Sequence, residues 1–150
     1  TQNAAESVKA AVAAVNDGEA VVVYPEGTIT RDPDLWPMSG KTGAARIALL
    51  SGAHVIPIAQ WGAQYVMGPY VKEFKVFPRK TMHMQVGPPV DLDDLRAESL
   101  TSEVLAAATA RIIDRITELL EDIRGEKAPP GRLDYKAWRQ ARETDQTEES

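Results

Sequence analysis

The stretch VVVYPEGT, from Val21 to Thr28, determines the fold that the sequence predicts. Its first residues are apolar and β-branched without interruption, which is typical of a strand buried on both faces of a sheet. Pro25 cannot donate to a sheet ladder and Gly27 tolerates backbone angles closed to other residues, so the strand is expected to end there. The predicted strand therefore spans Ala20–Tyr24. It leaves an acid, a glycine and a hydroxyl at its carboxyl end, where open α/β sheets hold ligands.

Helices and strands are predicted to alternate around this strand. Apolar residues at three- and four-residue steps predict a helix over Ala4–Asn16, which Gly18 closes as a left-handed cap. A second, alanine-rich helix is expected over Lys41–Leu50, and a second strand over His54–Gln60. This order predicts an α/β fold with a mainly parallel sheet and helices packed on its faces.

The second half of the chain is predicted to add an edge strand and one long helix. Residues 61–80 indicate a loop with one short helix or strand. Apolar and polar residues alternate over Thr81–Gly87, as in a half-exposed strand at a sheet edge. The strongest helical pattern covers Thr101–Arg124, whose apolar stripe is continuous and whose first residues, Thr101 or Ser102, suit an N-cap.

A polar tail is predicted after this helix. The domain is expected to cover residues 1–124, and residues 125–150 form a polar, partly disordered tail. Within it, Tyr135–Arg142 is expected to form a short helix, and the final ETDQTEES to be disordered.

Charge and composition narrow the class of protein. The 150 residues suit one soluble domain, and a net charge of −5 argues against a nucleic-acid partner. No apolar run reaches the roughly 20 residues that a membrane span needs. The chain has no cysteine, and its two histidines are too sparse for a metal site. Residues 25–80 nevertheless carry seven basic and four acidic side chains, a local balance of +3 that suits an anionic partner.

Lys41 and Glu26 are the first candidate site residues. The triplet Gly40–Thr42 resembles the end of a P-loop, but Leu35 stands where that motif requires glycine, which excludes a triphosphate cradle. Lys41 and the amides of residues 41–43 lie at a predicted helix N-terminus, which suits a single phosphate. The alternative is that Lys41 is a solvated first-turn residue.

Other candidates have structural alternatives. Glu26 either faces a ligand or pairs with Arg31 or Arg46. His54 and His83 lack a carboxylate at helical spacing, which favours structural or surface roles. The aromatic and basic stretch Trp61–Lys80 either lies on a membrane surface or packs as a loop over the sheet.

Three blocks in order resemble one family. Tyr24–Thr28 resembles the Phe-Pro-Glu-Gly-Thr block of the glycerolipid acyltransferases, the family that includes 1-acylglycerol-3-phosphate acyltransferase. Gly40–Arg46 resembles the Gly-Lys-x-Gly helix start that follows it, and Val55–Ala59 resembles the next block, Val-Pro-Val. The resemblance extends from the first helix to about Gly87.

This resemblance implies an activity and a set of substrates. The family transfers a fatty acyl group from acyl-coenzyme A or acyl-carrier protein to a (lyso)glycerol phosphate in phosphatidic acid synthesis, with no cofactor beyond the thioester donor. Such an enzyme is expected to act as a peripheral protein on the cytoplasmic face of a membrane. That context makes Trp61–Lys80 a more credible membrane contact.

The resemblance also implies which residues bind the acceptor. Glu26, Gly27 and Thr28 would line the acceptor pocket, with backbone amides and the Thr28 hydroxyl as donors. The family commonly has arginine after Glu-Gly-Thr, where this chain has Ile29. Arg31 and Lys41 are therefore the expected phosphate ligands.

The family's His-x4-Asp base motif is absent from the sequence, since Ala59 and Pro88 stand five residues after the two histidines. In the family this motif lies upstream of Pro-Glu-Gly-Thr, so it is expected before Thr1. No catalytic residue is assigned here. The chain is expected to be the C-terminal part of a catalytic domain and inactive alone. The alternative is a non-catalytic α/β module that binds phosphate or lipid.

Overall fold

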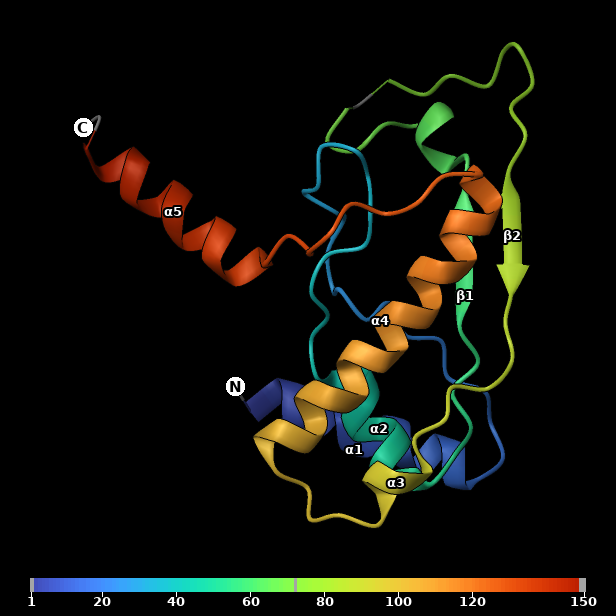
Figure 1. Ribbon diagram of the computed structural model, residues 1–150, viewed down its shortest axis with the longest axis vertical. Helices are drawn as coiled ribbons and strands as arrows, with labels where there is room; N and C mark the ends of the chain where they lie inside the picture. The colour runs from blue at the N-terminus through green and yellow to red at the C-terminus, as the bar shows by residue number, and fades with distance from the viewer. Residues whose placement is uncertain (1, 72, 149–150) are drawn as a thin grey trace.

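The long helix α4 (Ser102–Arg124) organises the computed structural model, which describes residues 2–71 and 73–148 (Figure 1). The hydroxyl of Thr101 accepts a hydrogen bond from the Val104 N–H at 3.3 Å, so the predicted N-cap is confirmed. Gly125 ends the helix in the left-handed conformation, with φ of 68°. Helix α2 and the two strands pack against this helix, and α1 packs against α2.

The described elements follow one another in a mixed order. In chain order they are α1 (Gln2–Asn16), α2 (Gly43–Ser51), β1 (Ile58–Trp61), the 3-10 helix η1 (Ala63–Tyr65), β2 (His83–Val86), α3 (Asp93–Arg96), α4 and α5 (Tyr135–Glu148). The predicted first helix, its Gly18 cap with φ of 87°, and the alanine-rich second helix are confirmed.

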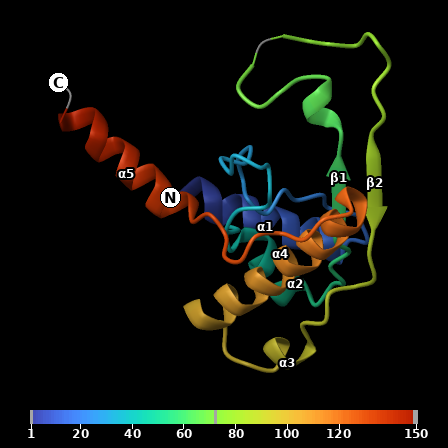
Figure 2. The ribbon, with the colours of Figure 1, turned by 45° about the horizontal axis from the view of Figure 1, so that its top comes forward.

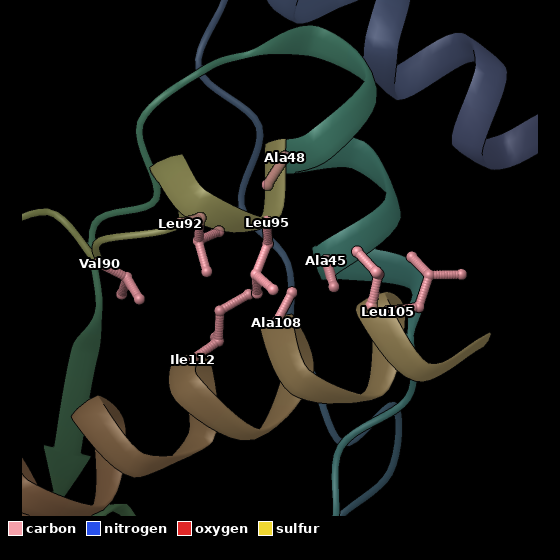
Figure 3. Packing of buried hydrophobic residues seen from close by; sticks show 9 residues of the cluster. Ala45, Ala48, Val90, Leu92, Leu95, Leu105, Ala108 and Ile112 are labelled. Atoms are coloured by element: carbon pink, nitrogen blue, oxygen red, sulfur yellow. The ribbon is translucent and has the colours of Figure 1, made fainter. Parts of the chain in front are cut away.

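The main core lies where α2 and α3 meet α4 (Figure 3). Alanines on α2 and α4 let the two helices approach closely, and leucines and an isoleucine fill the space beside them. The buried members are Ala45, Ala48, Val90, Leu92, Leu95, Val104, Leu105, Ala108 and Ile112. A smaller cluster of Trp36, Ala59 and Leu120 joins the loop before α2 to β1 and the end of α4.

The predicted mainly parallel sheet is wrong. Within the described residues the sheet has two strands, β1 and β2, which pair antiparallel with Ile58 opposite Val86 and Trp61 opposite His83. The edge-strand prediction near Thr81–Gly87 is confirmed in β2, whose side chains are mostly exposed.

The predicted buried strand Ala20–Tyr24 is also not formed. Its residues carry no strand assignment, and the side chains of Val22 and Tyr24 are 81% and 80% exposed. β-Branched residues favour an extended backbone, but a strand forms only where a second strand satisfies its N–H and C=O groups. No described strand lies beside this segment to do so.

The tail contains more helix than the sequence predicts. Helix α5 runs to Glu148, past the predicted end at Arg142, and extends away from the rest of the molecule in both views (Figures 1 and 2). Residues 149 and 150 lie outside the described residues. The division into 1–124 and 125–150 remains a prediction. Among the described helices none is long and apolar enough to cross a membrane.

Candidate anion-binding site

The Pro25–Thr28 segment, where the sequence predicts the end of a strand, forms a tight turn. The Gly27 N–H donates to the Tyr24 carbonyl oxygen at 3.0 Å, and Gly27 has a φ of 63°. A side chain at this position would strain the backbone, which explains the glycine. The same bond occupies the Gly27 amide, so the prediction that it is a free donor to a ligand is wrong.

Glu26 holds the turn to the loop that follows it. Its Oε2 accepts a hydrogen bond from the N–H of Met38, a fully buried residue, at 2.9 Å. Burial raises the pKa of Glu26, and the Met38 N–H lowers it by a smaller amount. In the described part of the chain Glu26 forms no ion pair with Arg31 or Arg46, so the structural alternative of an arginine partner is not observed.

Lys41 contacts the same turn through its backbone and its side chain. Its N–H donates to the Pro25 carbonyl oxygen at 2.7 Å, so this amide is not free as predicted. Its side chain lies beside Gly27, where a Cβ atom would come within 2.9 Å of Lys41 Nζ. The half-exposed Thr28 follows directly, and its hydroxyl has no hydrogen-bond partner among the described residues. The structure therefore places Gly27 and Lys41 in contact, with Thr28 next in the chain.

Arg31 also contacts Met38. Its N–H contacts the Met38 sulfur at 3.1 Å, and its guanidinium carbon lies 3.7 Å from the ring centre of Tyr70 and 5.0 Å from that of Trp138. The Tyr70 hydroxyl donates to the Ile29 carbonyl oxygen at 2.8 Å, which fixes the first ring against the loop. Arg31 Nε is buried and has no hydrogen-bond partner.

Sequence reasoning missed Tyr70 and Trp138 as neighbours of Arg31. Tyr70 was assigned to a surface loop and Trp138 to the tail, and neither stands at a spacing that relates it to Arg31. The only signal in the sequence is that both are aromatic, because a guanidinium group stacks favourably on such rings.

The five predicted site residues lie outside the two described cavities. One cavity of about 240 Å³ is lined by residues that include Asp32, Trp36 and Arg132. Another, of about 610 Å³, is lined mostly by charged residues between Asp91 and Glu118. None of the five residues lines either cavity; Gly27 and Lys41 are exposed, and Glu26, Thr28 and Arg31 are half-buried.

Comparison with known proteins identifies the family of this segment. A family model described as Acyltransferase matches residues 1–61, and no solved structure matches the chain. The matched region contains all three blocks that resemble the glycerolipid acyltransferases, although it ends before the predicted limit near Gly87. The match supports a general acyltransferase role. Residues 1–61 thus match the Acyltransferase family model, which is consistent with a glycerolipid acyltransferase family.

Proposed function

We propose that the protein is an O-acyltransferase that moves a fatty acyl group from acyl-coenzyme A or acyl-carrier protein to a (lyso)glycerol phosphate in phospholipid synthesis. The acceptor hydroxyl oxygen forms the new ester bond, the carbon–sulfur bond breaks, and the hydroxyl proton ends on the departing thiol. The observation that carries the proposal is the fastening of the Pro25–Thr28 turn to Met38 and Lys41, which sets a lysine over Gly27 within the family-matched segment.

Arg31 and Lys41 are the proposed ligands of the acceptor's phosphate. Neither side chain forms an ion pair in the part of the chain that the structure describes, and no carboxylate competes for them there. Arg31 offers the planar donor pair that suits two phosphate oxygens, and Lys41 offers a point charge. Thr28 supplies the free hydroxyl beside them. Glu26 supports this site through the Met38 N–H and leaves direct phosphate contact to the cations.

The proton-accepting base is assigned to no residue of this chain. His54 and His83 are both exposed, and neither has a described carboxylate partner. This observation favours a second candidate function, a non-catalytic module that binds a phosphate or a lipid headgroup. An enzyme must hold donor and acceptor side by side, whereas a module needs only the anion.

A membrane surface is the proposed location of the substrate. The segment of residues 65–77 exposes seven large apolar side chains, of which Phe77 is 83% and Phe74 68% exposed. Lys75, which pairs with Glu73 at 3.1 Å, stands among them and Arg79 follows them, which suits the cytoplasmic face of an anionic bilayer. Lys72, part of the same prediction, lies outside the described residues.

Charge reversal tests this location. Glutamate at Lys75, Arg79 and Lys80 is expected to reduce co-sedimentation with phosphatidylserine vesicles, while reversal at Lys136 on α5 serves as the control. Equal co-sedimentation of the wild type and all variants with the vesicles would show that these basic residues do not bind a membrane surface.

Calorimetric binding to the full chain tests the function. We expect 1-acylglycerol 3-phosphate to bind and monoacylglycerol, which lacks the phosphate, to bind at least about tenfold more weakly. Arg31→Ala and Lys41→Ala should each lose a similar factor, with Lys9→Ala as the control on α1. A non-reactive thioether analogue of acyl-coenzyme A should tighten acceptor binding if the protein is an enzyme. Acceptor binding unaffected by the analogue would favour the module, and no binding would reject both functions.

A further inference from the structure

Arg31 stands apart from the other arginines of the candidate site region because of what surrounds it. Its guanidinium lies over rings from two distant segments, Tyr70 in the loop after η1 and Trp138 in α5. Each ring is itself fixed by a contact. The Tyr70 hydroxyl is bonded to the Ile29 carbonyl, and Trp138 stacks on Tyr135 with ring centres 5.9 Å apart.

The segment before and at the start of α5 is bonded to the body of the protein close to Arg31. The Ser39 N–H donates to the Leu133 carbonyl oxygen at 3.0 Å, and the Tyr135 N–H donates to the Ser39 hydroxyl at 3.3 Å. Arg132 forms an ion pair with Asp114 of α4. The start of α5 is therefore attached to the same loop that carries Met38 and Lys41, although the rest of α5 extends away from the molecule (Figure 2).

The Nη atoms of Arg31 are the nitrogens of its guanidinium that a ligand can reach. Of its three nitrogens, Nε alone is both buried and without a hydrogen-bond partner, so an anion would reach the Nη atoms. Aromatic faces attract the cation but accept none of its N–H bonds in the plane. They also exclude water, which strengthens an ion pair formed at the open edge.

We propose that Tyr70 and Trp138 are positioning residues of the acceptor site, which hold Arg31 edge-on toward a phosphomonoester whose apolar portion lies against the two rings. This inference rests on the proposed function and adds the C-terminal helix to the site. The rings remove rotamer freedom from Arg31 before the ligand arrives, so less freedom is lost on binding. A phosphomonoester can come from a free sugar phosphate or from a lipid headgroup, and the rings favour the lipid.

Variants of the two rings test the proposal in the full chain. Trp138→Ala and Tyr70→Ala should each weaken binding of glycerol 3-phosphate by roughly three- to tenfold, the cost of ordering one free side chain. Trp138→Phe, which keeps an aromatic face, should restore most of the affinity. Arg142→Ala is the matched control, because its guanidinium carbon lies 5.3 Å from the same Trp138 ring but its side chain is exposed.

A spectroscopic measurement separates positioning from general damage. The Nε–H resonance of Arg31 should be shifted by the ring currents in the free protein, move on addition of glycerol 3-phosphate, and lose its ring-current shift in Trp138→Ala. Circular dichroism should show that each variant keeps its helices, since Trp138 lies outside both buried clusters.

The outcomes distinguish this inference from the proposed function. Loss of binding in Arg31→Ala with unchanged affinity in Trp138→Ala and Tyr70→Ala would overturn the role of the rings and leave the function standing. Failure of the wild-type chain to bind any phosphomonoester would overturn both. Tighter binding of 1-acylglycerol 3-phosphate than of glycerol 3-phosphate, lost in the ring variants, would identify the lipid headgroup as the source. Equal affinity for the two in every variant would reject the apolar contact.

Discussion

Two arginines of this chain lie over pairs of aromatic rings, and they differ in what their remaining donors do. The guanidinium carbon of Arg124 lies 3.9 Å from the ring centre of Trp36 and 4.3 Å from that of Trp61. Its Nη1 donates to the Asp34 carbonyl oxygen at 2.8 Å and its Nε to the Glu126 carboxylate at 2.6 Å. The Arg31 guanidinium has its two rings but no described carboxylate, and its Nε has no partner.

The difference separates a structural cation from a binding cation. Arg124, with a side chain only 11% exposed, satisfies its charge within the protein and joins the end of α4 to the loop around Trp36. The buried Arg31 Nε has no partner, which costs free energy, and the Nη atoms of Arg31 form no hydrogen bond or ion pair within the described residues, so they remain available to an anion. The same stacking geometry thus serves stability at Arg124, and we propose that it serves ligand binding at Arg31.

Replacing each arginine by methionine should give the largest difference between the two sites. Arg124→Met leaves the half-exposed Glu126 carboxylate and the Asp34 carbonyl without their donor and removes the stacking on two rings, so we expect the free energy of unfolding to fall by about 2 kcal/mol. Arg31→Met removes an unsatisfied donor along with a cation–π contact, so its change should stay below about 1 kcal/mol. Urea denaturation measures both. Equal losses would mean that Arg31 is a structural residue as well.

Gly40→Ala tests whether the loop that precedes Lys41 is packed against α4. A Cβ atom at Gly40 would come within 2.8 Å of the Thr109 methyl and 3.0 Å of Ile113 Cγ1 on α4. Such overpacking should cost about 2 kcal/mol in unfolding free energy, and it should displace the neighbouring Lys41. Gly43→Ala, at a position with open space, is the control. A fully stable Gly40→Ala protein would show that the loop is not held against the helix.

Gly27→Ala tests the turn itself. Alanine in the left-handed conformation should cost about 1 kcal/mol of stability, and its methyl group would push the Lys41 ammonium from its place. We therefore expect weaker phosphomonoester binding than the small stability loss explains. Gly18→Ala, also at positive φ but distant from Lys41 in the sequence, should lose similar stability without any change in binding. Identical phosphomonoester binding in the two variants would show that Lys41 is not a ligand of the phosphate.

The smallest expected effect concerns the pH dependence of stability. Burial raises the pKa of Glu26, so the folded protein keeps this proton to a higher pH than the unfolded chain. Stability should therefore fall as pH rises from about 4.5 through the raised pKa. Glu26→Gln keeps an acceptor for the Met38 N–H and should flatten this part of the profile. The exposed Glu19→Gln should leave it unchanged. A Glu26→Gln profile parallel to the wild type would contradict the assignment.

Local patterns predicted the helices and their caps, because those depend on residues near one another in the chain. The stripe of α4, the Thr101 cap and the Gly18 cap each follow from spacing within a few residues. The prediction of a mainly parallel sheet was wrong because it took Val21–Tyr24 as a buried strand from its β-branched residues alone. A strand also requires a partner, and no described segment supplies one.

The candidate site was predictable only in part for the same reason. Glu26 and Lys41 belong to short blocks that resemble a known family, and the structure ties both to one turn. The ring contacts of Arg31 join segments far apart in the chain, and no periodicity reports such contacts. Assignment of the amides of Gly27 and Lys41 as free donors overlooked the turn bonds that occupy them.

Nuclear magnetic resonance can show directly whether the Pro25–Thr28 turn, Arg31 and Lys41 bind a phosphate. Titration of the labelled full chain with glycerol 3-phosphate should shift the resonances of Gly27, Thr28, the Arg31 side chain and Lys41 together, with one dissociation constant. The Arg124 side chain should stay unchanged. Shifts confined to the basic residues of α4, such as Arg111 and Arg115, with none at the Pro25–Thr28 turn, would contradict the account.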